Sequence, residues 1–355
     1  MAEGKSQGGE SRILSALHQV VGIGALAIGG YVIYGVYDSM ILQPQRDGKK
    51  RTLELATKLG KPASTLGDLT EHELTLSQDV IRNDEIDVSF ADIGGMSEEL
   101  AEVQDNVILP MKHWKDMQGI MRMSTCPPGV MLYGKPGTGK TMTAKAIAKE
   151  SGATFMSVKA SSIMCKWVGE SEKLVSAMFS LARKLAPTVI FIDEIDTILK
   201  KRDNSQTNSH MSAALGLLMQ EWDGLLTSCG QDDTSPPVVV LGATNRPGDI
   251  DAAFQRRMPF RILTKAPDAA GRMDILRMQL RQLSIPDDLD LQQVAMQTEG
   301  FTGAEIKELC RMVSLIRLKA AVQDKQNKVE DGQGTSYSLR NEDFTAAILR
   351  MKPSA

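Results

Sequence analysis

One glycine-rich stretch has the residue types and spacing of a phosphate-binding loop. Residues 134–141 read GKPGTGKT, which fits the pattern G-x-x-x-x-G-K-[ST]. In such a loop the backbone N–H groups face phosphate oxygens, the lysine reaches the β- and γ-phosphates, and the hydroxyl binds Mg²⁺. Lys140 and Thr141 hold the last two positions. A short apolar strand before the loop and a helix after it are the setting that the motif needs, so we predict a site for a nucleoside triphosphate and Mg²⁺.

Two carboxylates follow an apolar run further along the chain. Residues 189–196 read VIFIDEID, the pattern of a buried strand that brings acids to its C-terminal edge, where ligands bind in parallel sheets. We expect Asp193 to hold Mg²⁺ with Thr141, and Glu194 to orient and deprotonate the attacking water. A solvated acidic turn would explain this stretch taken by itself, but the phosphate loop favours the hydrolytic interpretation.

Three further polar residues complete the predicted catalytic set. Asn245 ends a second apolar run, residues 239–247 (VVLGATNRP), where its amide can hydrogen-bond both the γ-phosphate and the water. Arg256 and Arg257 follow a short predicted helix. Because Lys140 already serves this chain's own site, we expect the arginine pair to act in a neighbouring subunit's site. A basic pair on the surface is the alternative.

Strands and helices alternate around these motifs. Strands are expected at Gly129–Tyr133, Thr154–Lys159, Thr188–Ile192, Val238–Ala243 and Phe260–Leu263, with helices at 142–150, 171–185 and 209–226. This alternation predicts an α/β domain whose parallel sheet is covered by helices on both faces. After Pro267 the strands stop, and helices at 270–282, 289–298, 303–324 and 341–351 predict a small all-helical domain. Polar loops are expected at 203–209 and 229–237.

The N-terminal region contains a candidate membrane anchor. Ile13–Tyr37 has no Asp, Glu, Lys or Arg and is long enough to cross a bilayer as a helix, which takes about 20 residues. Arg46, Lys49, Lys50 and Arg51 follow it, and basic flanks face the cytosol, so we expect everything after residue 37 to be cytosolic. A cleaved signal peptide and a buried soluble helix are the alternatives.

The predicted organisation has five parts. These are a short tail (1–12), a transmembrane helix (13–37), a linker domain (38–87), a large α/β domain (88–266) and a small helical domain (267–355). Within the linker we expect helices at Thr52–Leu59 and Leu69–Ile81, the second capped by Thr70 with Glu73 three residues on.

Composition excludes some classes of function. The net charge of −3 gives no reason to expect nucleic-acid binding. The four cysteines lie far apart without a C-x-x-C pair, which argues against a zinc site or a disulfide framework and suits reducing surroundings. A membrane-bound zinc protease would need H-E-x-x-H, which is missing. A scaffold with an inactive site is disfavoured because the lysine and both acids are intact.

These motifs together resemble an AAA ATPase over about residues 88–352. The resemblance rests on GKPGTGKT, VIFIDEID, GATNRP and QRRMP, with DIGG at 92–95 and GFTGAE at 300–305 as the adenine-side elements. It implies a homo-hexameric ring that binds ATP between subunits and threads protein through a central pore. The nucleotide-binding residues it implies are Asp92, Ile93, Gly94, Pro136, Gly137, Thr138, Gly139, Lys140, Thr141, Met142, Gly303 and Ala304.

Many AAA ATPases have a sensor arginine at the lid position where this chain has Gly303-Ala304. In this respect the chain resembles the branch of the family that contains katanin, spastin and the vacuolar-sorting ATPase. Within that branch the layout of one membrane span, a linker and one ATPase module, together with EWDGL at 221–225, resembles the ATPases of the mitochondrial outer membrane and peroxisome that extract mislocalised tail-anchored proteins. The resemblance implies such clients and a mitochondrial outer-membrane location, with the peroxisomal membrane as the alternative. A microtubule-severing enzyme or another protein-remodelling ATPase of the same branch is the competing function, but the linker lacks the basic charge that microtubule severing needs.

The resemblance also implies a first pore loop at Lys166, Trp167, Val168 and Gly169. The family more often has two adjacent aromatic residues there, and here the second is Val168. Grip on the substrate would then depend more on Trp167. Packing of Trp167 in the core is the alternative.

Overall fold

The computed structural model describes residues 43–116, 126–163, 169–200, 209–231, 235–281, 289–327 and 338–351. The predicted membrane span and three of the predicted pore-loop residues, Lys166, Trp167 and Val168, lie outside these ranges. Among the residues that the structure describes, no helix is long and apolar enough to span a membrane. The chain divides into two compact units, Met1–Leu74 and Thr75–Ala355.

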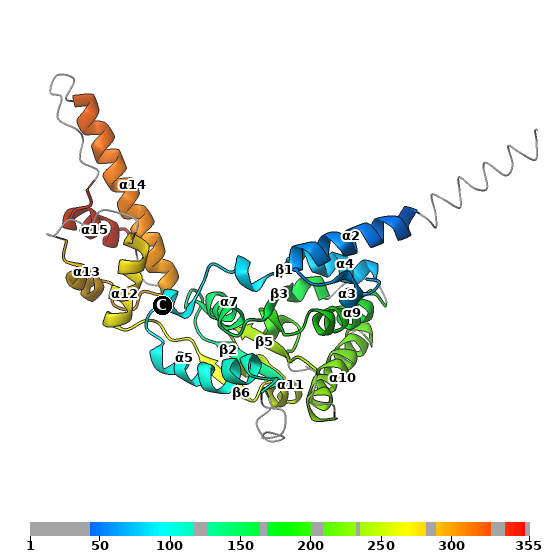
Figure 1. Ribbon diagram of the computed structural model, residues 1–355. Helices are drawn as coiled ribbons and strands as arrows, with labels where there is room; N and C mark the ends of the chain where they lie inside the picture. Colours follow the sequence, from blue (N-terminus) through cyan, green and yellow to red (C-terminus); the bar gives the residue numbers. More distant parts are fainter. Residues whose placement is uncertain are drawn as a thin grey trace, which may run out of the picture. The chain divides into compact units, whose positions relative to one another are not determined.

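The second unit is built on a six-stranded sheet (Figure 1). Its strands are β1 (Val80–Ile81), β2 (Gly129–Tyr133), β3 (Thr154–Lys159), β4 (Thr188–Asp193), β5 (Val238–Thr244) and β6 (Phe260–Leu263), in the spatial order β1-β3-β4-β5-β2-β6. The pairs from β3 to β6 are parallel. The two-residue edge strand β1 pairs antiparallel with β3, which the sequence analysis did not foresee.

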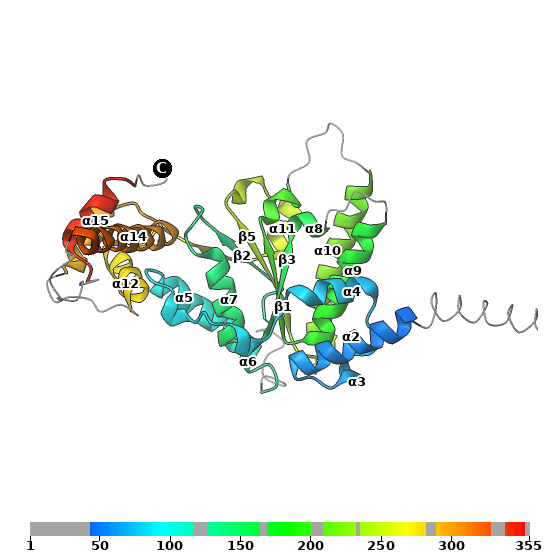
Figure 2. The ribbon, with the colours of Figure 1, turned by 90° about the horizontal axis from the view of Figure 1, so that it is seen from above.

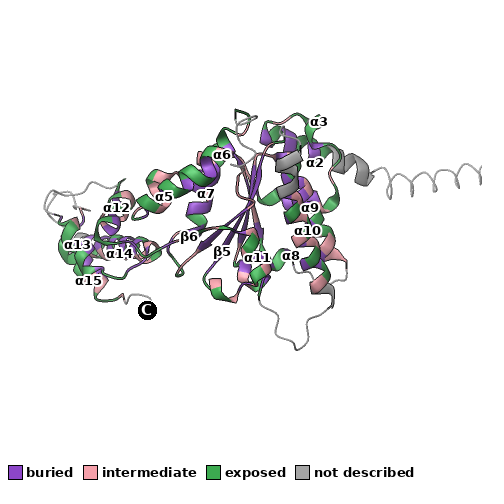
Figure 3. Cartoon of the chain, turned by 90° about the horizontal axis from the view of Figure 1, so that it is seen from below, coloured by how far each residue is buried: buried purple, intermediate pink, exposed green. Residues whose placement is uncertain are grey.

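The central strands are buried on both faces because helices cover the sheet from both sides. Every residue of β5 is buried, as its unbroken apolar run predicts for an inner parallel strand (Figure 3). Figure 2 shows α7 (Lys140–Glu150) on one side of the sheet, and α9 (Glu170–Leu185) and α10 (Ser209–Gln231) on the other. The predicted α/β layering is therefore confirmed.

In the described part of the chain after β6, four helices form the predicted small helical domain, which is called the lid below. They are α12 (Ala269–Leu280), α13 (Leu291–Gln297), α14 (Gly303–Asn327) and α15 (Asn341–Ile348). Their facing apolar side chains make a separate hydrophobic core around Leu276, Ile306 and Phe344. The lid has its own core, so it can keep its shape while its contacts with the sheet change.

The linker prediction is partly wrong. Helix α2 (Gln43–Leu59) begins well before Thr52, and α3 (Ala63–Leu66) follows it. Thr70 does cap α4 (Glu71–Leu76): its N–H donates to Glu73 Oε2 at 2.8 Å, and the Glu73 N–H donates to Thr70 Oγ1 at 3.2 Å. However, the chain leaves the helix after Leu76 and passes through a 3₁₀ turn into β1. Pairing of β1 with β3 overrides the local helical pattern.

Two other stretches differ from expectation. Residues 97–112 form α5 (Ser97–Val103), a π-helical turn (Gln104–Ile108) and α6 (Leu109–Lys112), where no element was predicted. Val107 and Ile108 in this stretch are fully buried in the main core. Helix α10 also continues to Gln231, into residues 229–237 that were expected to be a loop. The burial of Val107 and Ile108 accounts for the first difference, because it depends on core neighbours that local sequence does not specify.

Candidate active site

The predicted nucleotide-site residues gather around one cavity of about 460 Å³ at the C-terminal ends of the parallel strands. They come from the segment before α5, the loop after β2, the start of α7, the ends of β4 and β5, and the start of α14. The expected residues that line the cavity are Asp92, Ile93, Gly94, Pro136, Gly137, Thr138, Gly139, Lys140, Thr141, Met142, Asp193, Glu194, Asn245, Gly303 and Ala304.

The phosphate loop wraps around the amino group of its lysine. Lys140 Nζ donates to Gly134 O at 3.0 Å and to Lys135 O at 2.7 Å, and only 9% of the residue is exposed. Burial lowers the pKa of this amine, and the charge of Asp193 partly opposes the shift. A partly desolvated cation beside the cavity favours an incoming anion such as a phosphate group.

The loop fits tightly against the end of β6. A side chain at Gly134 would come within 2.2 Å of Thr264 O, so only glycine allows this approach. Thr138 was predicted to bind nucleotide, and its hydroxyl bonds to Lys135 O and to Thr264 Oγ1, both at 2.8 Å. The side chain of Thr138 therefore fixes the loop, although the residue still lines the cavity.

The two predicted metal ligands lie next to each other. Thr141 Oγ1 donates to Asp193 Oδ2 at 3.4 Å, which brings a hydroxyl from α7 and a carboxylate from β4 to one place. Oxygen ligands of this kind, one of them charged, suit Mg²⁺, which binds through one or two protein oxygens and phosphate oxygens. The residues present thus fit a nucleotide-bound Mg²⁺ ion.

The backbone at Glu194 is held in an unusual conformation. Its φ of 49° is positive, and no other non-glycine residue among those described shares this feature. Its N–H donates to Asp193 Oδ1 at 2.9 Å, and the Thr197 hydroxyl donates to its carbonyl at 2.8 Å. Such a conformation costs free energy and persists where neighbouring contacts enforce it, so it marks Glu194 as a functional candidate.

Asn245 sits on a turn that is anchored at both ends. Thr244 Oγ1 donates to Asp196 Oδ1 at 2.6 Å, and the Arg246 N–H donates to Thr244 Oγ1 at 2.9 Å. These bonds tie the end of β5 to the acidic stretch after β4. The Asn245 amide is thereby kept at the same edge of the sheet as Glu194, and both residues line the cavity.

The opposite end of the cavity is formed by the segment before α5 and by the lid. The Ser89 N–H and hydroxyl each donate to Asp92 Oδ2 at 2.8 Å, and these bonds lower the pKa of Asp92. From the lid, the Ala304 N–H donates to Gly137 O at 3.1 Å and so joins α14 directly to the phosphate loop. This end of the cavity therefore has walls from both the α/β domain and the lid.

Several lining residues were missed by the sequence analysis: Lys265, Pro267, Ile275, Met278, Gln279 and Lys307. Ile275, Met278 and Gln279 share one face of α12, because positions three and four apart lie together on a helix. That spacing was visible in the sequence, but nothing in it indicated that this face would point toward the phosphate loop.

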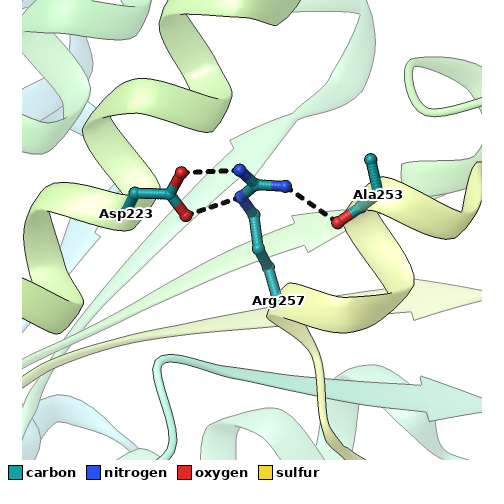
Figure 4. Close-up of polar contacts among 3 residues, drawn as sticks. All are labelled: Asp223, Ala253 and Arg257. Atoms are coloured by element: carbon teal, nitrogen blue, oxygen red, sulfur yellow. Dashed lines mark hydrogen bonds and ion pairs between the residues drawn. The ribbon is translucent and has the colours of Figure 1, made fainter.

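The two predicted arginine fingers do not line the cavity of their own chain, and they differ from each other. Both are at the end of α11 (Ala252–Arg257). Figure 4 shows Arg257 held by two bonds to the Asp223 carboxylate, at 2.8 and 2.6 Å, and by a 2.9 Å bond to Ala253 O. Arg256 is exposed and has no hydrogen-bond or ion-pair partner among the described residues.

Of the predicted pore loop, only Gly169 is described. It has a φ of 81° and precedes the first turn of α9.

Comparison with known proteins places this arrangement in a family. Residues 130–266 match the ATPase family associated with various cellular activities (AAA), and residues 288–331 match the AAA+ lid domain. The chain is also 38% identical over 350 residues to the outer mitochondrial transmembrane helix translocase of Homo sapiens, covering 97% of this chain and 94% of that protein. The chain belongs to the AAA ATPase family.

Proteins from other animals show a similar level of sequence identity to this AAA ATPase. The outer mitochondrial transmembrane helix translocase of Xenopus tropicalis is 38% identical over 351 residues, which cover 97% of this chain and 94% of that protein. A protein named mitochondrial sorting homolog, from Caenorhabditis elegans, is 39% identical over 278 residues and 78% of each chain. The similarity to the named translocases thus extends well beyond the ATPase module.

Proposed function

We propose that this AAA ATPase is a membrane-anchored, homo-hexameric translocase that uses ATP hydrolysis to extract mislocalised tail-anchored proteins from the mitochondrial outer membrane. The observation that carries the proposal is the gathering of the lysine, hydroxyl, two acids and amide around one cavity, in a chain that matches transmembrane helix translocases along nearly its whole length. The peroxisomal membrane is the alternative location.

In the proposed reaction, ATP binds between the phosphate loop and the lid. Lys140 neutralises charge on the β- and γ-phosphates, and Asn245 hydrogen-bonds the γ-phosphate and the attacking water. Glu194 accepts a proton from that water as the water attacks the γ-phosphorus. The bond between this phosphorus and the β–γ bridging oxygen breaks, so that ADP and phosphate leave. Bound Mg²⁺, held by Thr141 and Asp193, would supply charge neutralisation on the phosphate oxygens.

The neighbouring subunit completes each site. Arg256 is exposed at the end of α11 and meets no partner among the described residues, which suits a side chain that reaches into another subunit. An arginine supplied in this way stabilises the charge that develops on the transferred phosphoryl group. ATP hydrolysis would therefore depend on ring assembly, and the cavity of one isolated chain would hydrolyse ATP slowly.

Two further parts of the proposal rest on sequence. Ile13–Tyr37 would anchor the ring in the membrane, with the ATPase module in the cytosol. The pore-loop residues 166–169 would grip the client, Trp167 through apolar contact that does not depend on client sequence. Clients would be membrane proteins whose exposed ends can enter the pore.

Extraction of a tail-anchored test protein from liposomes by the full-length chain tests the proposal. The unmodified chain should release the client in the presence of ATP, and Glu194→Gln should not. Trp167→Ala should lose extraction while it retains basal ATP hydrolysis, and Val168→Ala should lose less because valine offers less contact area.

The same samples exclude a packing role for Trp167. A core tryptophan cut to alanine costs roughly 3–5 kcal/mol, so melting temperature and hydrolysis would then fall together. That joint loss would overturn the pore-loop assignment. An unmodified chain that hydrolyses ATP and leaves the client in the liposome would overturn the proposed function.

A further inference from the structure

The direction in which α11 presents its arginines depends on contacts outside that helix. α11 has six residues, Ala252–Arg257, and a helix this short is not stable by itself in water. Asp251 caps its start by accepting a 2.8 Å bond from the Ala253 N–H. The C-terminal turn, which carries both arginines, must therefore be held by other elements.

Consecutive residues of α10 provide this support. The fully buried Trp222 ring lies 6.4 Å from the Phe254 ring of α11, measured between centroids, and its Nε1 donates to Pro128 O at 3.1 Å. The next residue, Asp223, accepts the two bonds from Arg257. Trp222 and Asp223 belong to the EWDGL stretch that the proposed reaction does not otherwise use, and they connect α10 to the middle and to the last residue of α11.

The Arg257 guanidinium is engaged within its own subunit. Each of its three nitrogens donates a bond, two to the Asp223 carboxylate and one to Ala253 O. Its side chain is only 19% exposed. A two-point arginine–carboxylate pair is planar and charge-assisted, so it fixes orientation as well as distance. An arginine bound in this way is poorly placed to contact a phosphate group of another subunit.

We propose that Arg257 and Asp223 are positioning residues that hold the end of α11 so that Arg256 alone points into the neighbouring subunit's site. This inference rests on the proposed function, because it assumes that Arg256 acts across the subunit boundary. Rotation or fraying of the last turn would separate Arg257 from Asp223 and would move Arg256 with it. Catalytic groups displaced by about 1 Å can lose on the order of 10² in rate.

Turnover measurements on the full-length assembled chain test the inference. Arg256→Ala should lower kcat by on the order of 10³-fold, as expected for loss of an arginine finger. Arg257→Ala and Asp223→Ala should each lower kcat by a smaller factor, about 10- to 100-fold, with KM unchanged. The double variant should lose less than the two single losses combined, because the Arg257–Asp223 pair is already gone in each single variant. Arg257→Lys, which keeps one ion pair, should recover part of the loss.

A second ion pair on α10 provides a matched control. Arg183 Nη2 bonds to Glu221 Oε2 at 2.6 Å, and Glu221 lies two residues before Asp223 but faces α9 rather than α11. Glu221→Ala should therefore leave kcat unchanged. If it lowers kcat as much as Asp223→Ala does, the effect is general loosening of α10 and the positioning role is overturned.

Other outcomes separate the inference from the proposed function. If Arg257→Ala lowers kcat far more than Asp223→Ala, then Arg257 acts directly on the nucleotide and the inference fails while the proposed function stands. If Arg256→Ala leaves kcat unchanged, the trans role proposed for Arg256 fails. Should Asp223→Ala not fold, Asp223→Asn keeps the side-chain shape, removes the charge and replaces one of the two acceptor oxygens with an NH₂ group. Its kcat should also fall, because the two-point pair with Arg257 is lost.

Discussion

Replacing Glu194 with glutamine should separate ATP binding from ATP hydrolysis. The side chain is exposed and makes no hydrogen bond to any residue that the structure describes, and its backbone is held by Asp193 and Thr197. The fold should therefore tolerate the change. Loss of a positioned general base lowers the rate on the order of 10²–10⁴-fold. At about 1.36 kcal/mol per tenfold, the barrier rises by about 2.7–5.4 kcal/mol.

Two assays on one preparation check this expectation. ATP turnover should fall by the factor given above, while titration with a fluorescent nucleotide should give a Kd within about twofold of the parent, because the Lys140, Thr141 and Asp193 contacts remain. Turnover within threefold of the parent would show that Glu194 is not the base.

Glu194→Gly provides an internal control on the backbone conformation. A left-handed conformation costs an L-residue about 1–2 kcal/mol, and glycine gives back about 0.5–1 kcal/mol through the entropy of the unfolded chain. The net gain of about 0.5–1 kcal/mol should raise the melting temperature of the glycine variant about 1–3 °C above that of the glutamine variant. Both variants should be inactive. A glycine variant that melts below the glutamine variant would refute the argument from backbone strain.

Three other predictions follow from the same structure. Lys140→Met should abolish the rise in melting temperature that saturating nucleotide gives the parent. Burial lowers the pKa of Lys140 in the folded state below 10.5, so the free energy of unfolding of the parent should increase with pH between that folded-state pKa and 10.5. Urea titrations of the variant should not show this increase. Gly271→Ala would place a methyl group 2.6 Å from the Gly95 Cα, so it should cost about 1–3 kcal/mol in urea unfolding and weaken fluorescent-nucleotide binding; no change in either would show that the contact is loose. Removal of residues 1–38 should leave an ATPase that no longer sediments with membranes, and release of the full chain by carbonate would show that Ile13–Tyr37 does not span.

Local patterns in the sequence predicted most of the fold because their signals are short-range. The phosphate loop is recognisable from residues 134–141 alone, since its turn depends on glycines at fixed spacing. Continuous apolar runs predicted the inner strands β4 and β5, because a strand covered on both faces has no polar side. The capping box at Thr70 could also be predicted, because it links residues only three positions apart.

Elements that depend on distant partners could not be predicted in this way. The strand β1 has only two residues and exists because it pairs with β3 more than seventy positions away. The lid residues Ile275, Met278 and Gln279 line the cavity because a separate helical domain folds back over the phosphate loop. No local pattern specifies which face of α12 does so.

The arginine pair shows most clearly what sequence could predict and what depended on tertiary contacts. Sequence predicted that Arg256 and Arg257 form one functional unit, because adjacent arginines after a short helix have the same local pattern. Asp223, 34 positions away, decides that Arg257 is bound within its own subunit while Arg256 is left exposed. Residue type and spacing therefore determined the chemistry that this chain can perform. The packing of α10 against α11 decided which of two identical side chains is bound within the chain and which is exposed, because an ion pair forms only where folding brings its two charges together.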